Sequence, residues 1–224
     1  APVHVNGMRG NFTPDLSWRW SPAVRELTYA MNRTAALPAE TAPGDWPRFR
    51  GPMGDGRAEG VRFQTDWSKP PQELWRRRVG LGWSSFAAVG EYVFTQEQRG
   101  DDETVVCYRA ADGEQIWVTG GTVQFEDPMG PGPRATPTYA DGALYTLGVT
   151  GILRCLDAAT GETRWERRLE EDTGAFLPQW GFASSPLVTA DQVLVYAGGR
   201  GGKAVAAYAR ATGALVWTGG TGAQ

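Results

Sequence analysis

The sequence predicts an all-β fold, an incomplete β-propeller of three four-stranded antiparallel blades that follows an irregular N-terminal lead-in. The first observation is a phrase that occurs three times, in which a glycine follows a small polar residue and a tryptophan lies four positions after the glycine. The three pairs are Gly113 and Trp117, Gly161 and Trp165, and Gly213 and Trp217. The second observation is that these pairs recur about every 50 residues, a period typical of propeller repeats built from short strands and turns.

Each copy contains patterns for four short strands joined by three short connections. In the second copy these patterns cover residues 135–139, 144–147, 152–155 and 163–167. Gly161 supplies the positive φ that a tight hairpin requires. The same order in the other copies predicts that residues 83–218 form three consecutive blades. Aromatic and β-branched residues occupy both faces of the strands, so we expect each repeated tryptophan to pack against a neighbouring blade.

The chain divides into a lead-in over residues 1–60, which lacks the repeat, and a repeat region over residues 61–224. Within the lead-in, a serine followed by Pro22 predicts the start of one short helix over 23–31. The prolines between residues 35 and 47 predict an extended linker. The lead-in therefore carries little regular structure of its own.

Residues 73–76 resemble the outer strand of a blade without its first three strands, and in a closed propeller they would complete the final blade. Propellers close with about four to eight blades. Three blades therefore predict the front part of a longer propeller with an open edge at its last blade. The first residue is Ala1 rather than methionine, which indicates either a cleaved leader or an excised fragment.

Composition excludes several classes of protein. The 22 basic and 25 acidic side chains give a net charge of −3, which does not favour nucleic-acid binding. The sequence contains no apolar stretch of about 18 residues, so it predicts no transmembrane segment. The single histidine, His4, lies in the lead-in, which excludes a Ser-His-Asp triad within the blades, and no zinc-binding spacing occurs. Cys107 and Cys155 hold equivalent places in successive blades, so we expect two free, buried thiols about 10 Å apart.

Two phrases of the repeat region read PTYADGALY (137–145) and LDAATGETRW (156–165). They resemble the repeats of the pyrroloquinoline-quinone (PQQ)-like β-propeller superfamily, and the resemblance extends over residues 62–218. This superfamily includes quinoprotein alcohol dehydrogenases and the BamB-type lipoproteins of the outer-membrane barrel-assembly machinery. A shorter phrase, GDWPRFRGP (44–52), resembles the lead-in of bacterial PQQ-like repeat proteins of uncharacterised role.

The resemblance implies the fold more strongly than the function, because the repeated glycine and tryptophan maintain blades in enzymes and scaffolds alike. Quinoprotein dehydrogenases have adjacent cysteines that form a ring disulfide against the quinone. They also have a Glu/Asn/Asp set that holds calcium, and a catalytic aspartate. Cys107 and Cys155 are not adjacent, and we do not match the acidic set to numbered positions of this chain, which counts against the enzyme interpretation but leaves it open. No cofactor is expected in the favoured interpretation, and PQQ with calcium is expected in the alternative one.

The connections between blades and the second hairpin of each blade share one face, because the strands of a blade alternate in direction. On this loop face we expect the partner-binding residues to be Glu97, Arg99, Phe125, Arg134, Phe176 and Trp180. Arg134, Ser85 and Ser185 stand at the entries of the innermost strands. Arg134 could pair there with an anionic ligand or bond loop carbonyls in a structural role, and the serines could face a ligand or cap turns.

Two functions remain open from the sequence. The favoured one is a non-catalytic propeller of the bacterial cell envelope, periplasmic or otherwise exported, whose loop face binds a protein partner. The alternative is the N-terminal part of a PQQ-dependent quinoprotein alcohol dehydrogenase. The favoured hypothesis rests on the strong fold signal and on the missing catalytic set.

Overall fold

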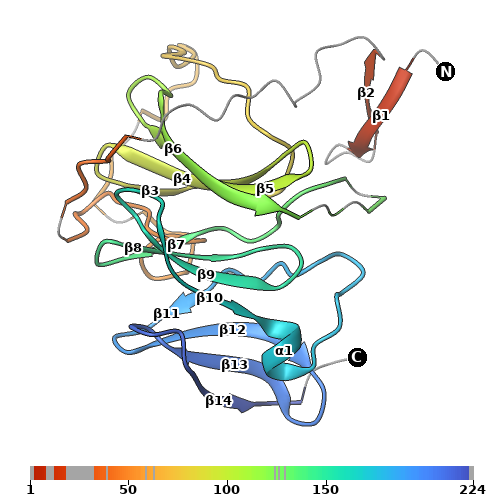
Figure 1. Ribbon diagram of the computed structural model, residues 1–224. Coiled ribbons are helices and arrows are strands. Elements are labelled where there is room, and N and C mark those ends of the chain that lie inside the picture. Colours follow the sequence, from red (N-terminus) through yellow and green to blue (C-terminus); the bar gives the residue numbers. More distant parts are fainter. Residues whose placement is uncertain are drawn as a thin grey trace.

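Three four-stranded antiparallel sheets make up most of the structure, a computed structural model drawn in Figure 1. The sheets follow one another along the chain and stack one below the next, from yellow-green through teal to blue. The structure describes residues 3–8, 13–18, 33–38, 40–58, 60–62, 64–123, 125, 127–128 and 130–221. The helix predicted over 23–31 lies outside these residues. The predicted fold class, an incomplete propeller of three four-stranded blades, is confirmed.

Each sheet is one blade, with its strands in sequence order. Blade 1 contains β3 (Ala87–Val89), β4 (Tyr92–Arg99), β5 (Asp102–Arg109) and β6 (Gln115–Thr122). Blade 2 contains β7 (Thr138–Ala140), β8 (Ala143–Leu147), β9 (Ile152–Asp157) and β10 (Thr163–Arg168). Blade 3 contains β11 (Leu187–Val188), β12 (Gln192–Gly199), β13 (Lys203–Ala209) and β14 (Leu215–Gly219). A separate hairpin pairs β1 (Val3–Met8) with β2 (Pro14–Trp18), which corrects the expectation of an irregular lead-in over these residues.

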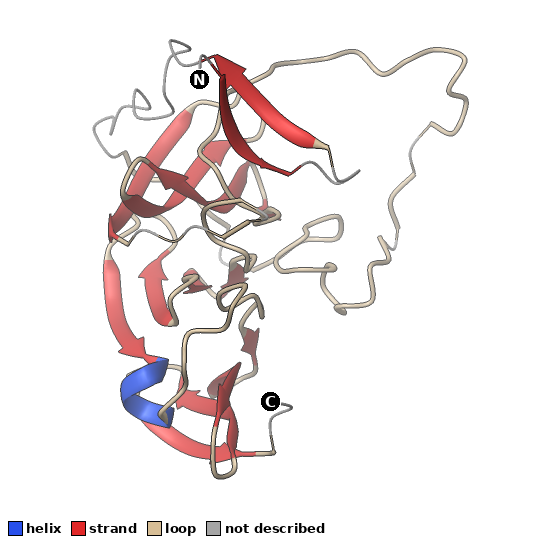
Figure 2. Ribbon diagram, turned by 90° about the vertical axis from the view of Figure 1, so that its right-hand side faces the viewer, coloured by secondary structure: helices blue, strands red, loops and turns tan. Residues whose placement is uncertain are grey.

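The first strands of the blades lie nearest to their common axis. Strand β7 contacts both β3 and β11, so the three short first strands converge. Figure 2, turned by 90°, shows the three sheets following an arc rather than closing a ring. The entries of β3, β7 and β11 therefore meet on one face, which is the loop face of the propeller.

The third connection of every blade is the tight glycine turn that the sequence predicts. The φ angles are +70° at Gly113, +77° at Gly161 and +70° at Gly213. A β-bulge follows in each outer strand, one residue before the tryptophan. The bulge sets the register so that Trp117 lies opposite Cys107 and Trp165 lies opposite Cys155.

The buried tryptophans hold the turn of the following blade. The indole Nε1 of Trp117 donates a hydrogen bond to the carbonyl oxygen of Ala158 over 3.1 Å, and its ring lies against Gly161. A Cβ on Gly161 would meet the ring at 2.7 Å, so the close approach requires glycine as much as the positive φ does. Trp165 makes the same pair of contacts with blade 3, to a turn carbonyl at 3.0 Å and to Gly213.

Trp75 makes the same contacts from the lead-in side. Its Nε1 donates to the carbonyl oxygen of Ala110 over 2.9 Å, and its ring lies against Gly113. Residues 73–76 therefore hold, toward blade 1, the position that an outer strand holds toward the next blade. They do so without a sheet partner among the described residues.

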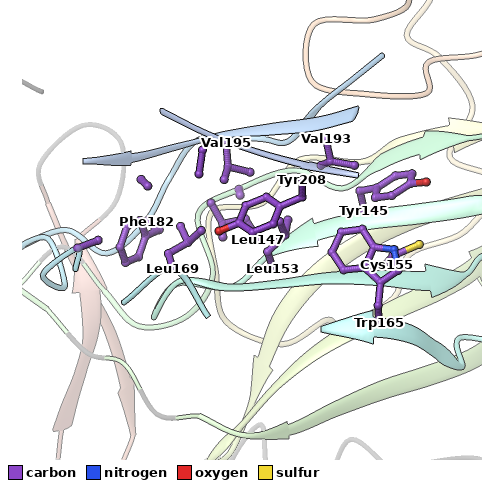
Figure 3. Packing of buried hydrophobic residues seen from close by; sticks show 14 of the residues in the cluster. Tyr145, Leu147, Leu153, Cys155, Trp165, Leu169, Phe182, Val193, Val195 and Tyr208 are labelled. Atoms are coloured by element: carbon purple, nitrogen blue, oxygen red, sulfur yellow. The ribbon is translucent and has the colours of Figure 1, made fainter. Parts of the chain in front are cut away.

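Two hydrophobic cores fill the spaces between the blades. The core between blades 2 and 3 is drawn in Figure 3, where Tyr145 and Trp165 of blade 2 lie across from Val193 and Tyr208 of blade 3. The core between blades 1 and 2 contains Trp117, which is completely buried. Burial of such large apolar side chains is the main source of stability that joins one blade to the next.

A short helix, α1 (Leu169–Thr173), begins the connection from blade 2 to blade 3, where the sequence analysis expects only a loop. Three acidic residues occupy its first turn, which is favourable beside the positive end of the helix dipole. Gly174 ends the helix in the left-handed conformation, with φ of +68°. Leu169 is fully buried in the core between blades 2 and 3, so the helix anchors the start of this connection.

The lead-in crosses the inner edge of blades 1 and 2. Trp46 pairs with Ala88 of β3 through two backbone hydrogen bonds of 2.7 and 2.8 Å. The next carbonyl, that of Pro47, accepts a hydrogen bond of 2.8 Å from the amide of Tyr139 in β7. This segment therefore acts as an additional inner edge, and the loop that follows it, residues 48–54, reaches the loop face.

Candidate functional site

An aromatic cleft of about 780 Å³ lies on the loop face of blade 3, between the second inter-blade connection and the β12–β13 hairpin. Its aromatic walls are Phe176, Trp180 and Tyr196, which are 69%, 49% and 46% exposed. The guanidinium of Arg200 lies 4.8 Å from the ring centroid of Phe176, a cation–π arrangement. The aromatic cleft thus offers large flat apolar surfaces beside one cation.

The connection that carries Phe176 and Trp180 is fixed at both of its ends. Ala175 and Phe182 are buried, and the amide of Phe182 donates a 2.8 Å hydrogen bond to the carbonyl of Val149. Phe176 and Trp180 lie between these anchors and are exposed. Its side chains are presented to solvent on a fixed base.

Arg134 joins the two inter-blade connections. Its Nη2 pairs with the carboxylate of Asp127 and donates to the carbonyl of Gly130 over 2.8 Å, while its Nε donates to the carbonyl of Trp180 over 3.3 Å. Its guanidinium also lies 5.5 Å from the ring centroid of Phe125, which is buried. The structural role, one of the two alternatives left open by the sequence, is therefore observed for Arg134. Its Nη1 has no hydrogen-bond partner among the described residues and is buried.

Glu97 and Arg99 lie inside blade 1, which corrects the expectation that they stand exposed on the loop face. Both side chains are 2% exposed and form an ion pair of 2.5 Å, and the Tyr108 hydroxyl donates to the same carboxylate oxygen over 2.8 Å. Burial, followed by the nearby carboxylate, raises the pKa of Tyr108. The reason for the burial is the segment before β3, since Leu81 pairs with Gln98 and covers this end of β4.

The hydroxyls at the strand entries link successive blades. The amide of Ser85 donates to Thr136 Oγ1 over 3.1 Å, and the amide of Thr136 donates to Ser185 Oγ over 2.9 Å. The three residues occupy equivalent positions, so one hydrogen bond repeats from blade to blade. This observation supports a structural role for Ser85 and Ser185. Thr136, whose hydroxyl follows the same pattern, was not identified from the sequence.

A second hollow of about 440 Å³ lies where the lead-in loop meets the entries of β7 and β11, and we call it the lead-in pocket. Its walls include the side chains of Arg48, Phe49, Met53, Trp83, Arg134 and Ser185. The phrase at 44–52 was noted in the sequence without being assigned to a site. The position of this segment depends on its backbone pairing with β3, which the periodicity of the sequence does not predict.

The cysteines and acidic residues in the described part of the chain do not gather into a cofactor-binding or metal-binding site. Cys107 and Cys155 are free and buried in two different inter-blade cores, and burial raises the pKa of both thiols. No group of three His, Cys, Asp or Glu side chains that could hold a metal ion occurs among the described residues. No described helix is long and apolar enough to cross a membrane.

Known proteins share both the repeat and the fold of this chain. A family model described as "Outer membrane protein assembly factor BamB" matches residues 101–224, more than half of the sequence. The chain belongs to the PQQ_2 family. No curated protein matches it in sequence. The membership agrees with the resemblance expected from the repeated phrases.

Several solved structures similar to this PQQ_2 chain are longer proteins. A quinohemoprotein alcohol dehydrogenase from Pseudomonas putida HK5 matches with a TM-score of 0.61 and 18% identity, over 83% of this chain and 29% of that one. A europium-containing methanol dehydrogenase matches with a TM-score of 0.58 and 19% identity, over 80% and 32%. BamB from Moraxella catarrhalis matches with a TM-score of 0.42 and 21% identity, over 65% and 39%.

This PQQ_2 chain therefore spans about a third of the length of these three proteins. At these identities, the similarity to the two dehydrogenases shows the propeller fold alone. What those proteins bind or oxidise is a property of the longer chains.

Proposed function

We propose that this chain belongs to a non-catalytic, exported propeller of the bacterial cell envelope that binds a protein partner through the aromatic cleft. The observation that carries the proposal is the exposure of Phe176 and Trp180 on a connection whose two ends are buried. Exposed aromatic residues that gather around a cleft on a fixed base are typical of protein-binding surfaces.

The cleft has the features of an interface anchor. Aromatic side chains bury much area and lose few rotatable bonds on binding, so they dominate interface energies. Trp180 is tied through its carbonyl to Arg134, which also holds the first inter-blade connection. Two of the predicted partner residues, Arg134 and Phe125, thus support the cleft from beneath, whereas Phe176 and Trp180 form its surface.

The family description favours the same function. The matching model is described by the role of an assembly factor, which acts through other proteins, and the propeller lends itself to binding on its loop face. A cell-envelope location, periplasmic or otherwise exported, follows from the same membership as a proposal.

Site-specific photo-crosslinking tests the partner face. A photo-reactive phenylalanine analogue is placed at 176 or 180 in the full-length protein, and at Trp67 as a matched control, because Trp67 and Phe176 are both 69% exposed. We expect one discrete protein adduct from 176 and 180 that is missing from 67. No adduct at 176 and 180, or an identical set of adducts at all three positions, would contradict the proposal.

The second candidate function is the N-terminal part of a PQQ-dependent dehydrogenase, which the fold of the two solved dehydrogenases favours. The described residues do not fit a binding site for PQQ and calcium. Cys107 and Cys155 lie in separate cores and cannot form a platform of adjacent cysteines, and the described residues supply no three-carboxylate cluster for calcium. No catalytic step is therefore assigned to this chain.

A further inference from the structure

The lead-in pocket is assembled from four separate parts of the chain. The lead-in loop supplies Arg48 and Phe49, and the segment before β3 supplies Trp83. The connections that enter β7 and β11 supply Arg134 and Ser185. The walls come from all three blades and from the lead-in, and they form a concave site of about 440 Å³, within the range of small-ligand pockets.

The charges of the pocket walls favour an anion. Among the described residues that line it, two are arginines and none is acidic. Among the described residues, the side chain of Arg48 bonds to the carbonyl oxygens of Gly51 and Pro52 and to no carboxylate, so these bonds do not neutralise its charge. Arg134 shares its charge with Asp127, which leaves the lining positive.

The pocket has a hydroxyl donor without an acceptor. Ser185 Oγ accepts the amide hydrogen of Thr136, and its own hydroxyl hydrogen meets no acceptor in the part of the chain that the structure describes. The donors of Arg134 are not available in the same way. Its Nε and Nη2 bond to Trp180, Asp127 and Gly130, and its Nη1, which has no partner among the described residues, is buried.

Two aromatic side chains give the lead-in pocket apolar surface beside its positive charge. Trp83 is 45% exposed and lies 5.8 Å from the guanidinium of Arg134, and Phe49 is 53% exposed at the mouth. An inorganic anion would contact the polar groups of the pocket and leave these aromatic surfaces uncovered. The ring surfaces therefore favour an organic anion whose apolar part contacts Trp83.

We propose that the lead-in pocket binds a small organic anion that presents a carboxylate or phosphate group to Arg48 and Ser185. Guanidinium groups bind both acids through paired charge-assisted hydrogen bonds. The proposal goes beyond partner binding at the aromatic cleft and depends on different residues.

Calorimetric titration of the full chain tests the pocket, with benzoate as the carboxylate probe and phenyl phosphate as the phosphate probe, each at matched ionic strength. We expect saturable binding of at least one probe, and the tighter probe identifies the acid group. Arg48→Gln should weaken binding at least about tenfold. Arg57→Gln is the matched control, since it removes the same charge from an 81% exposed side chain outside the pocket and should leave binding unchanged.

A measurement on the unaltered protein covers the case in which Arg48→Gln fails to fold. Phenylglyoxal modifies accessible arginines, and mass spectrometry reports the rate at each position. The bound probe should slow the modification of Arg48 and leave that of Arg57 unchanged. The proposal is overturned by a lack of saturable binding to both probes, by equal loss of affinity in both variants, or by equal modification of Arg48 with and without the probe.

Discussion

Trp117 and Trp217 hold the same position of the same repeat in opposite environments. Trp117 is 0% exposed and packs against Gly161 of the next blade, whereas Trp217 is 41% exposed and donates to the side chain of Gln192 in its own blade. No glycine turn lies over Trp217 among the described residues. The comparison shows that the repeat sequence builds the strand, the bulge and the turn, and that the neighbouring blade decides whether the tryptophan becomes core.

The first test removes the two tryptophans in turn. Trp117→Ala should lower the free energy of unfolding by about 3–5 kcal/mol, the range for emptying a large aromatic site in a core. Trp217→Ala should cost about 1 kcal/mol or less, because much of its ring already contacts water. Denaturant midpoints measure both changes. Equal losses would mean that the two blade faces do not differ in packing.

The second test separates the two reasons for glycine in the turn. Gly161→Ala forces a Cβ into a positive φ and against the Trp117 ring at 2.7 Å, so we expect a loss of about 2–4 kcal/mol. Gly142→Ala is the matched control, since its φ is +72° and no atom lies within 4 Å of the added Cβ. It should cost about 1–2 kcal/mol. A cost at Gly142 as large as that at Gly161 would show that backbone strain alone explains the need for glycine in the repeated turns.

The third test concerns a buried carboxyl at the interface of blades 1 and 2. Glu103 Oε2 accepts a 2.9 Å hydrogen bond from the amide of Val149, while Oε1 has no partner among the described residues. Burial raises the pKa of Glu103 above its ordinary value of 4.5. Because the folded state holds the proton more tightly, the stabilisation from this group is present below that value and is lost as the pH rises through the folded pKa.

Glu103→Gln removes this titration and keeps an oxygen acceptor for Val149. The free energy of unfolding of the variant, relative to that of the unaltered protein, should therefore rise between about pH 4 and pH 7. This rise should be smaller than the changes expected above. Chemical denaturation at both pH values provides the measurement. An unchanged difference between the two proteins would show that Glu103 has the same pKa in the folded and unfolded states.

The sequence predicted the blades because their signals are local. A glycine followed by a tryptophan four positions later is sufficient to place a turn and an outer strand, and the likeness of residues 73–76 to an outer strand identified the segment that carries Trp75. The short helix α1 was missed because five residues carry no helical periodicity, although Gly174 is a typical C-terminal signal.

The candidate site was predicted less completely because burial depends on distant segments. Phe176 and Trp180 were assigned to the surface from their place in a long connection, and both are exposed. Glu97 was also assigned to the surface, yet the Gly80 amide and its neighbours cover it. The position of Arg48 depends on the pairing of the lead-in with β3, a contact between residues far apart in sequence.

The choice between a binding propeller and a quinone enzyme is tested most directly by cofactor retention. The full-length protein is incubated with calcium and PQQ, passed through gel filtration, and examined for bound quinone and for dye reduction with a simple alcohol. A binding propeller should retain no stoichiometric PQQ and should not oxidise the alcohol. Retention of one quinone per chain together with alcohol-dependent dye reduction would contradict the proposed function and establish the dehydrogenase instead.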